Sequence, residues 1–251
     1  MFKLLDRFYE KSRIWFAVAW IVAYVLLASE ADALSLDLGA QKMVTAPVLL
    51  AMSVVLWAWV RHSGLGEHFG LRAPSVSASR MLWYLPIAII AVKKLFFGIA
   101  PDGTAAECLF WVISMCCVGY IEELIFRGFL FRAMDEDGRT SAVVVSSITF
   151  GMGHIVNSFN ATGQDLLTSL VQVVFAVSVG FVLVLVLLKG GSLWPCVVFH
   201  MVNNALVIFE NEAAQVALFG SEQMAMLVGP GVSLILALGY SFYLLRLPDA
   251  E

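Results

Sequence analysis

The stretch from Tyr120 to Gly128 reads Tyr-Ile-Glu-Glu-Leu-Ile-Phe-Arg-Gly and places two adjacent carboxylates and one arginine inside a long apolar segment. An ionisable side chain in a membrane segment costs roughly 2.5 to 3.5 kcal/mol on insertion scales, so it normally faces the protein interior and has a role there. Glu123 and Arg127 share one face of a helix, whereas Glu122 is rotated by about 100°. We expect Arg127 to neutralise Glu123 and leave Glu122 as the freer carboxylate, suited to accept a proton from water.

Further polar residues lie on two later apolar segments, with His154 on one and His200 and Asn204 on the other. Phe150 precedes His154 by one helical turn, where its ring would fix the imidazole and keep it dry. His200 and Asn204 are separated by one turn and project together, so we expect them to hydrogen-bond a developing oxyanion. Asn203 is a weaker candidate for the same role.

The composition is that of a membrane protein. Of 251 residues, 61% are hydrophobic and only 14% are charged, and the mean hydropathy of +0.88 exceeds that of ordinary soluble domains. We therefore expect an all-α, polytopic membrane helix bundle in contact with the lipid bilayer, and no nucleic-acid partner. The four cysteines lie in apolar segments, where a thiol is usually a small buried hydrophobe, so we expect no disulfide framework.

Apolar runs of near-membrane length predict about eight transmembrane helices joined by short polar links. No internal repeat is visible, and we expect a single integral-membrane domain over residues 1–251 with a motif-bearing core at about 107–209. The expected helices are about Ser12–Ser29, Val44–Val60, Met81–Ile99, Glu107–Met134, Ser141–Val156, Leu166–Leu188, Ser192–Phe209 and Met224–Leu245.

With eight spans both termini lie on one side of the membrane, and the basic residues indicate which side. Lys42, Lys93 and Lys94 fall at one end of the bundle, and all other Lys and Arg residues fall at the end that holds the termini. By the positive-inside rule both termini are cytoplasmic, and the acidic links face outward. We expect an integral protein of a bacterial inner membrane.

Helix geometry places the polar residues at similar depths. At 1.5 Å rise per residue, Glu122 lies about 18 Å and His154 about 20 Å from the expected cytoplasmic ends of their helices. His200 and Asn204 lie about 12 and 18 Å from theirs. Because these segments alternate in direction, the residues reach one level and are expected to form one site.

Structural roles are open for the same residues taken singly. A His or Asn in a membrane helix commonly serves as an interhelical hydrogen-bonder, which applies to His154, His200 and Asn204. The pairing of Glu123 with Arg127 is better explained by helix positioning than by chemistry. The shared depth of all these groups, in a chain with so few charges, favours a common functional site.

The residues resemble the CAAX protease and bacteriocin-processing family of intramembrane proteases (the CPBP or Abi family), which is related to the type II CAAX prenyl endopeptidases. Three motifs carry the resemblance: Glu-Glu-x-x-x-Arg at Glu122–Arg127, Phe-x-x-x-His at Phe150–His154 and His-x-x-x-Asn at His200–Asn204. The similar stretch covers about Glu107–Phe209, and the segments before it carry no matching motif.

The resemblance implies an eight-helix membrane endopeptidase whose site lies in a cavity open toward the cytoplasm. Glu122 and His154 would activate a water, and His200 with Asn204 would hold the oxyanion. Glu123, Arg127 and Phe150 would support them. The substrate would be a membrane-associated protein or peptide, and the prenyl specificity of the related enzymes is not carried over.

Metal involvement is open on the residues alone. Glu122, His154 and His200 would suffice to hold zinc with one position left for water. His200 with Asn204 fits an oxyanion hole equally well. We favour the glutamate mechanism without a cofactor, and keep zinc as the alternative.

Other classes of membrane protein use buried polar residues too. A non-catalytic scaffold would retain the residues without chemistry, and a proton-coupled transporter would use Glu122 as its carrier. A transporter is expected to show repeats and interrupted helices in matching halves, which the sequence lacks. A zinc protease of another type would carry His-Glu-x-x-His, and this signature is absent.

Overall fold

The computed structural model of the protein describes residues 2–158 and 165–250. Within these ranges every regular element is helical, apart from one isolated bridge between Ile99 and Glu210, and the expected all-α helix bundle is confirmed. Elements labelled η are 3-10 helices, except η3, which is a π-helix. In chain order the elements are α1 (Phe2–Lys11), α2 (Arg13–Asp37), α3 (Thr45–Ser63), η1 (Ala78–Tyr84), α4 (Leu85–Val92), η2 (Lys93–Phe97), α5 (Ala105–Glu123), η3 (Leu124–Phe131), α6 (Arg132–Asp135), α7 (Arg139–Gly153), η4 (His154–Ser158), α8 (Leu166–Gly190), α9 (Trp194–Ala205), η5 (Leu206–Phe209), α10 (Glu212–Phe219) and α11 (Glu222–Leu244).

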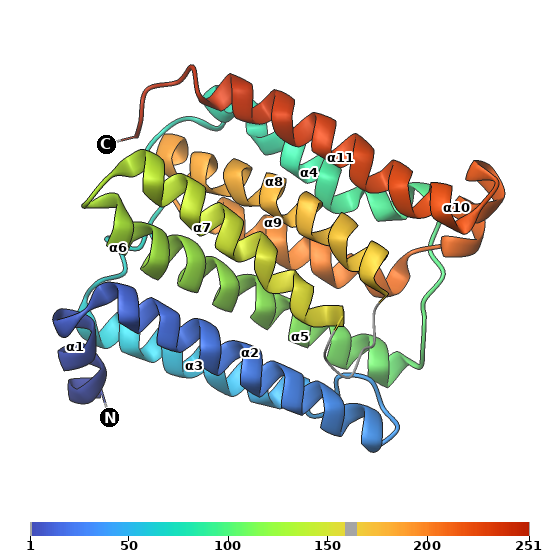
Figure 1. Ribbon diagram of the computed structural model, residues 1–251, viewed down its shortest axis with the longest axis horizontal. Coiled ribbons are helices and arrows are strands. Elements are labelled where there is room, and N and C mark those ends of the chain that lie inside the picture. Colours follow the sequence, from blue (N-terminus) through green and yellow to red (C-terminus); the bar gives the residue numbers. More distant parts are fainter. Residues whose placement is uncertain (1, 159–164, 251) are drawn as a thin grey trace.

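The long helices form three layers (Figure 1). The pair α2 and α3 covers one side, and the pair α4 and α11 covers the other. Between them lie α5, α7, α8 and α9, with α5 packed on α9 and α7 packed on α8. Both termini lie at one end of the bundle, and α10 lies at the opposite end. The motif-bearing helices are therefore the inner layer.

Five helices in the described ranges are long and apolar enough to cross a membrane: α2, α3, the continuous helix Ala105–Asp135, α8 and α11. The other three expected spans contain shorter helices. The fifth expected span holds α7 and η4, the seventh holds α9 and η5, and the third, Met81–Ile99, holds α4 between two 3-10 helices. That third span is broken into η1, α4 and η2, because Leu82, Trp83 and Tyr84 have φ of 50°, 49° and 57° and leave the right-handed helix. The sequence analysis missed α1 and α10, which have 10 and 8 residues and are too short to resemble spans.

Two glycines allow the inner helices to approach at backbone distance. A Cβ on Gly119 of α5 would lie 2.7 Å from the backbone nitrogen of Met201 in α9. A Cβ on Gly151 of α7 would lie 2.7 Å from the backbone nitrogen of Val177 in α8. Small residues at such crossings are typical of membrane bundles, where close packing drives helix association. These crossings bring the motif residues of different helices into contact.

The crossing at Gly119 makes a testable prediction. We expect Gly119→Ala to lower the free energy of unfolding by about 1 to 3 kcal/mol, because the methyl group would push α9 away. Gly239→Ala in α11 is the matched control, since nothing lies within 4 Å of its added Cβ, and it should be neutral or slightly stabilising. Thermal unfolding of the detergent-purified variants measures the difference, and equal unfolding temperatures would contradict the assigned contact.

Candidate active site

Each motif-bearing helix changes its winding at its motif. Helix α5 ends at Glu123 and continues as the π-helix η3, which contains Arg127. Helix α7 passes into a 3-10 turn at His154, and α9 does so at Leu206, soon after Asn204. Departures from regular α-helix of this kind are frequent at functional sites because they redirect side chains and backbone groups.

A buried polar network joins α5, η3 and α9. Glu123 and Arg127 are fully buried, and Arg127 Nη1 donates to Glu123 Oε1 at 3.2 Å, as their spacing predicted. His200 Nδ1 lies 2.8 Å from the same carboxylate oxygen. Arg127 Nη2 also donates to the carbonyl of Gly180 in α8, at 3.4 Å. The ion pair thus fixes the orientation of the His200 ring through a shared oxygen atom.

Glu122 has partners that the sequence analysis did not anticipate. The hydroxyl of Tyr24, in α2, donates to Glu122 Oε1 at 2.6 Å, and His200 Nε2 lies 3.5 Å from Glu122 Oε2. Glu122 is only 9% exposed. The contact with Tyr24 joins residues 98 positions apart, and a tyrosine in an apolar helix looks like any core aromatic in the sequence. Sequence reasoning therefore missed Tyr24.

Phe150 lies at the centre of the site. Its ring packs edge-on against His154 and His200, with centroid distances of 5.4 and 5.7 Å, and the Arg127 guanidinium carbon stands 4.1 Å above its centroid. His154 Nδ1 lies 3.3 Å from the Phe150 carbonyl, so that Nε2 is the nitrogen left for other partners. The expected placement of Phe150 one turn before His154 is present, and the same ring also orients His200.

The two asparagines of α9 are linked to each other. Asn203 Nδ2 donates to Asn204 Oδ1 at 2.9 Å, and the Trp111 indole donates to the Asn204 backbone carbonyl at 3.1 Å. Because the Asn204 side-chain oxygen accepts from Asn203, its amide N–H groups remain donors for another group. No hydrogen bond joins His200 to Asn204 among the described residues, and their joint role as oxyanion donors stays a prediction. Asn203, considered the weaker candidate, orients Asn204.

A cavity of about 1130 Å³ reaches these residues. Its inner wall includes Phe150, His154, His200, Asn203 and Asn204, whereas Glu122 is not among the described residues that line it. Its outer wall comes from η2, the start of α8, α10 and the start of α11, at the end of the bundle opposite both termini (Figure 1). No described residue of the 61–80 link lines it. The sequence predicted that the cavity opens toward the cytoplasm and that both termini are cytoplasmic. Because the cavity opens at the end opposite the termini, these two predictions exclude each other.

Residues 104–206 match the model of a family described as type II CAAX prenyl endopeptidase Rce1-like. Over these residues the chain is similar to that family. The matched segment holds all three motifs and confirms the resemblance based on them, although it covers less than half of the chain and excludes Tyr24. Comparison with the curated proteins and with the solved structures gave no match.

Similarity to the Rce1-like family supports, in general terms, intramembrane endopeptidase activity on a protein or peptide. Family members are membrane proteins, in agreement with the apolar helices of this chain. The match does not assign roles to the residues of the Rce1-like segment.

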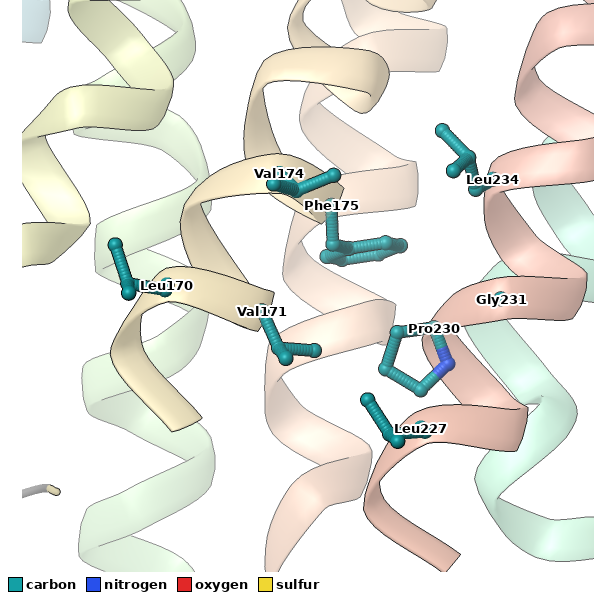
Figure 2. Close-up of a pocket in the computed structure, with 8 residues that line it drawn as sticks. All are labelled: Leu170, Val171, Val174, Phe175, Leu227, Pro230, Gly231 and Leu234. Carbon is teal, nitrogen blue, oxygen red and sulfur yellow. The ribbon is translucent and has the colours of Figure 1, made fainter. Parts of the chain in front are cut away.

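An apolar groove of about 290 Å³ lies between α8 and α11 and adjoins the larger cavity described above. Figure 2 shows that Val171 and Phe175 on α8 face Pro230 on α11 across this groove. The same three residues also line the larger cavity. One wall of the cavity is therefore apolar and borders exposed apolar side chains of α8 and α11, including Leu170 and Leu227.

Zinc is the alternative that the sequence leaves open, with Glu122, His154 and His200 as its ligands. Among the described residues there is no group of three or more His, Cys, Asp or Glu side chains placed to hold a metal ion. His200 directs Nδ1 to Glu123, and His154 directs Nδ1 to a backbone carbonyl. These hydrogen bonds leave Nε2 of both histidines for another partner, and hydrogen bonds of the same kind orient the histidines of zinc sites.

The ion pair in the Rce1-like segment can be tested through stability. We expect Arg127→Leu to lower the free energy of unfolding by about 3 to 5 kcal/mol, because it leaves the Glu123 carboxylate buried without its cation. Arg139→Leu removes an arginine that pairs with Asp135 at the same spacing and also with Asp249. Its side chain is 51% exposed, so we expect a smaller loss, of about 1 kcal/mol. Thermal unfolding of both variants in detergent measures this, and similar losses would contradict a structural role for the buried pair.

Proposed function

We propose that this protein is an intramembrane endopeptidase that hydrolyses a peptide bond of a membrane-associated protein or peptide. The family match supports the general class. The observation that carries the finer proposal is that Glu122 Oε2 lies 3.5 Å from His200 Nε2, while His200 itself lines the inner wall of the cavity together with His154. In this position a carboxylate, two imidazoles and an amide can act together on a bound peptide.

In the proposed reaction Glu122 acts as the general base. Tyr24 holds Glu122 Oε1, so the second carboxylate oxygen is the one available to accept a proton from water. His154, with Nδ1 held by the Phe150 carbonyl, would orient the same water through Nε2. The water oxygen attacks the peptide carbonyl carbon as Glu122 takes the proton. The proton then passes to the departing amine as the C–N bond breaks.

The oxyanion formed by this attack needs hydrogen-bond donors. Asn204 supplies its amide N–H groups, because its oxygen is engaged by Asn203. His200 Nδ1–H donates to Glu123, so donation to the oxyanion from Nε2 requires a proton on both ring nitrogens. The proposal therefore assigns His200 its charged form in the transition state, with the Glu123 carboxylate as its counter-ion.

All the roles in this proposal are filled by side chains, and none is given to a metal. Water activation is assigned to Glu122 and His154, and oxyanion binding to His200 and Asn204. Glu123, Arg127 and Phe150 support them through the buried network described above. Zinc bound by Glu122, His154 and His200 remains the alternative, and it would require the three side chains to reorganise.

Replacing the proposed base should abolish cleavage while the protein still folds. Glu122→Gln keeps the size and hydrogen bonding of the side chain but cannot accept the proton, so we expect no proteolysis by this variant. Mass spectrometry of protein termini in membranes and medium, from source cells expressing each chain at matched levels, gives the readout. New termini found only with the native chain support the proposal, whereas identical termini with both chains favour a non-catalytic scaffold.

Loss of the Tyr24 hydroxyl should slow cleavage without unfolding the protein. We expect Tyr24→Phe to lower the rate at which those termini appear by about 10-fold, since Glu122 Oε1 loses its fixed donor. Tyr240→Phe is the control, because Tyr240 also donates a buried hydrogen bond, at 2.7 Å to the Met81 carbonyl, but on α11. Equal rates for the two variants at equal folded yield would remove Tyr24 from the site.

A further inference from the structure

We propose that the cavity is reached from the side of the membrane opposite both termini, and that it admits a segment bearing Lys or Arg. The identity of this segment as a substrate rests on the proposed function, whereas the direction of access and the charge preference do not. Four observations carry the proposal: the closure of one end of the bundle, the charges at its two ends, the charges of the cavity rim and an unpartnered buried acceptor.

The end of the bundle that holds the termini is closed by aromatic side chains. Phe16, Trp59, Phe69 and Phe129 have no exposed surface and contact one another, with centroid distances of 4.7 Å between Phe16 and Trp59 and 5.0 Å between Phe69 and Phe129. Phe129 lies in η3, less than two turns from Glu123 along the chain. A water or peptide would have to displace this packed cluster to reach the site from that end.

The charges at the two ends of the bundle assign the open end to the outer side. Of the 15 Lys and Arg residues, Lys42, Lys93 and Lys94 lie at the end with the cavity mouth, Arg127 is buried in the site, and the other 11 lie toward the end with the termini. Short basic links stay in the cytoplasm during membrane insertion. The cavity mouth therefore faces away from the cytoplasm.

The rim of the cavity is acidic. Four carboxylates line it, from Asp165, Glu210, Glu212 and Glu222, against two ammonium groups, from Lys93 and Lys94. Lys94 Nζ lies 3.6 Å from Glu210 Oε2, and Lys93 Nζ donates to Ser233 Oγ at 2.6 Å, so both lysines are directed at groups of the protein. The formal charge of the rim at pH 7 is −2. A cavity lined by one sign of charge concentrates ions of the opposite sign.

The inner wall of the cavity contains a hydrogen-bond acceptor that has no donor within the protein. Asn203 Oδ1 is buried without a hydrogen-bond partner, in a residue that is 8% exposed and lines the cavity. An unpaired buried acceptor costs about 1 to 3 kcal/mol, which a bound N–H group would recover. Backbone N–H groups and Lys or Arg side chains all supply such a donor, so the inner wall can bind a peptide segment, whereas the preference for Lys or Arg comes from the charges of the rim.

Thiol reagents test the direction of access without relying on catalysis. Val207 lines the cavity, whereas Ala73 is exposed near the end with the termini. We expect Val207→Cys to react with membrane-impermeant methanethiosulfonates in intact cells, and Ala73→Cys to react only after lysis. The native chain gives the background, because none of its four cysteines lines the cavity. Reaction of Val207→Cys only after lysis would overturn the assigned side.

The same residue tests the charge preference. For Val207→Cys we compare the reaction rates of a trimethylammonium and a sulfonate methanethiosulfonate, and divide their ratio by the same ratio measured with a small thiol in solution. We expect this normalised ratio to be about 10, because the acidic rim attracts the cationic reagent. Adding Glu212→Gln and Glu222→Gln should return this ratio toward one. A ratio of one before these changes would overturn the charge preference. If both results hold but Glu122→Gln leaves all protein termini unchanged, the proposed function fails and the access route stands.

Discussion

The buried ion pair between Glu123 and Arg127 is the constraint on which the rest of the site depends. Both side chains are removed from solvent, so their charges are tolerated only while each keeps its hydrogen-bond partners. Those partners come from several helices: His200 from α9, the Gly180 carbonyl from α8 and the face of Phe150 from α7. The inner helices must therefore be docked before the pair is stable, and docking them also sets the positions of the histidines. One electrostatic requirement fixes both the fold of the inner layer and the geometry of the site.

Local spacing predicted the parts of the site that lie within one helix. The pairing of Glu123 with Arg127 and the placement of Phe150 beside His154 follow from positions one turn apart, which helix geometry determines. The hydrogen bond from Tyr24 to Glu122 could not be predicted, because it depends on how α2 packs against α5 and no local pattern marks it. Which of the two adjacent asparagines can donate to a bound group likewise depends on side-chain rotamers. In the structure Asn203 donates to the side-chain oxygen of Asn204.

Hydropathy predicted where the chain enters apolar surroundings but not how each segment is wound. The expected span Met81–Ile99 is apolar enough for a membrane helix, yet its backbone leaves the helix at Leu82 and resumes at Leu85. The short helix α10 lies in one of the acidic links, for which the sequence predicted no helix, and it forms part of the cavity rim. Because the rim is assembled from links, the direction in which the cavity opens depends on tertiary structure that composition does not contain.

The direction of the cavity also explains how polar chemistry is compatible with an apolar bundle. The proposed hydrolysis requires water near Glu122, and the cavity with its acidic rim is a route lined by several charged groups that reaches His154 and His200. A second opening through the aromatic cluster around Phe129 would expose that packing to water and would place the basic end of the bundle in contact with the site. Closing one end with aromatic rings and lining the other with carboxylates therefore allows a single path for both water and substrate. On this path a cationic segment meets favourable charge at the mouth, an apolar wall from Val171 and Phe175 beside it, and unpaired hydrogen-bonding groups only at the inner end.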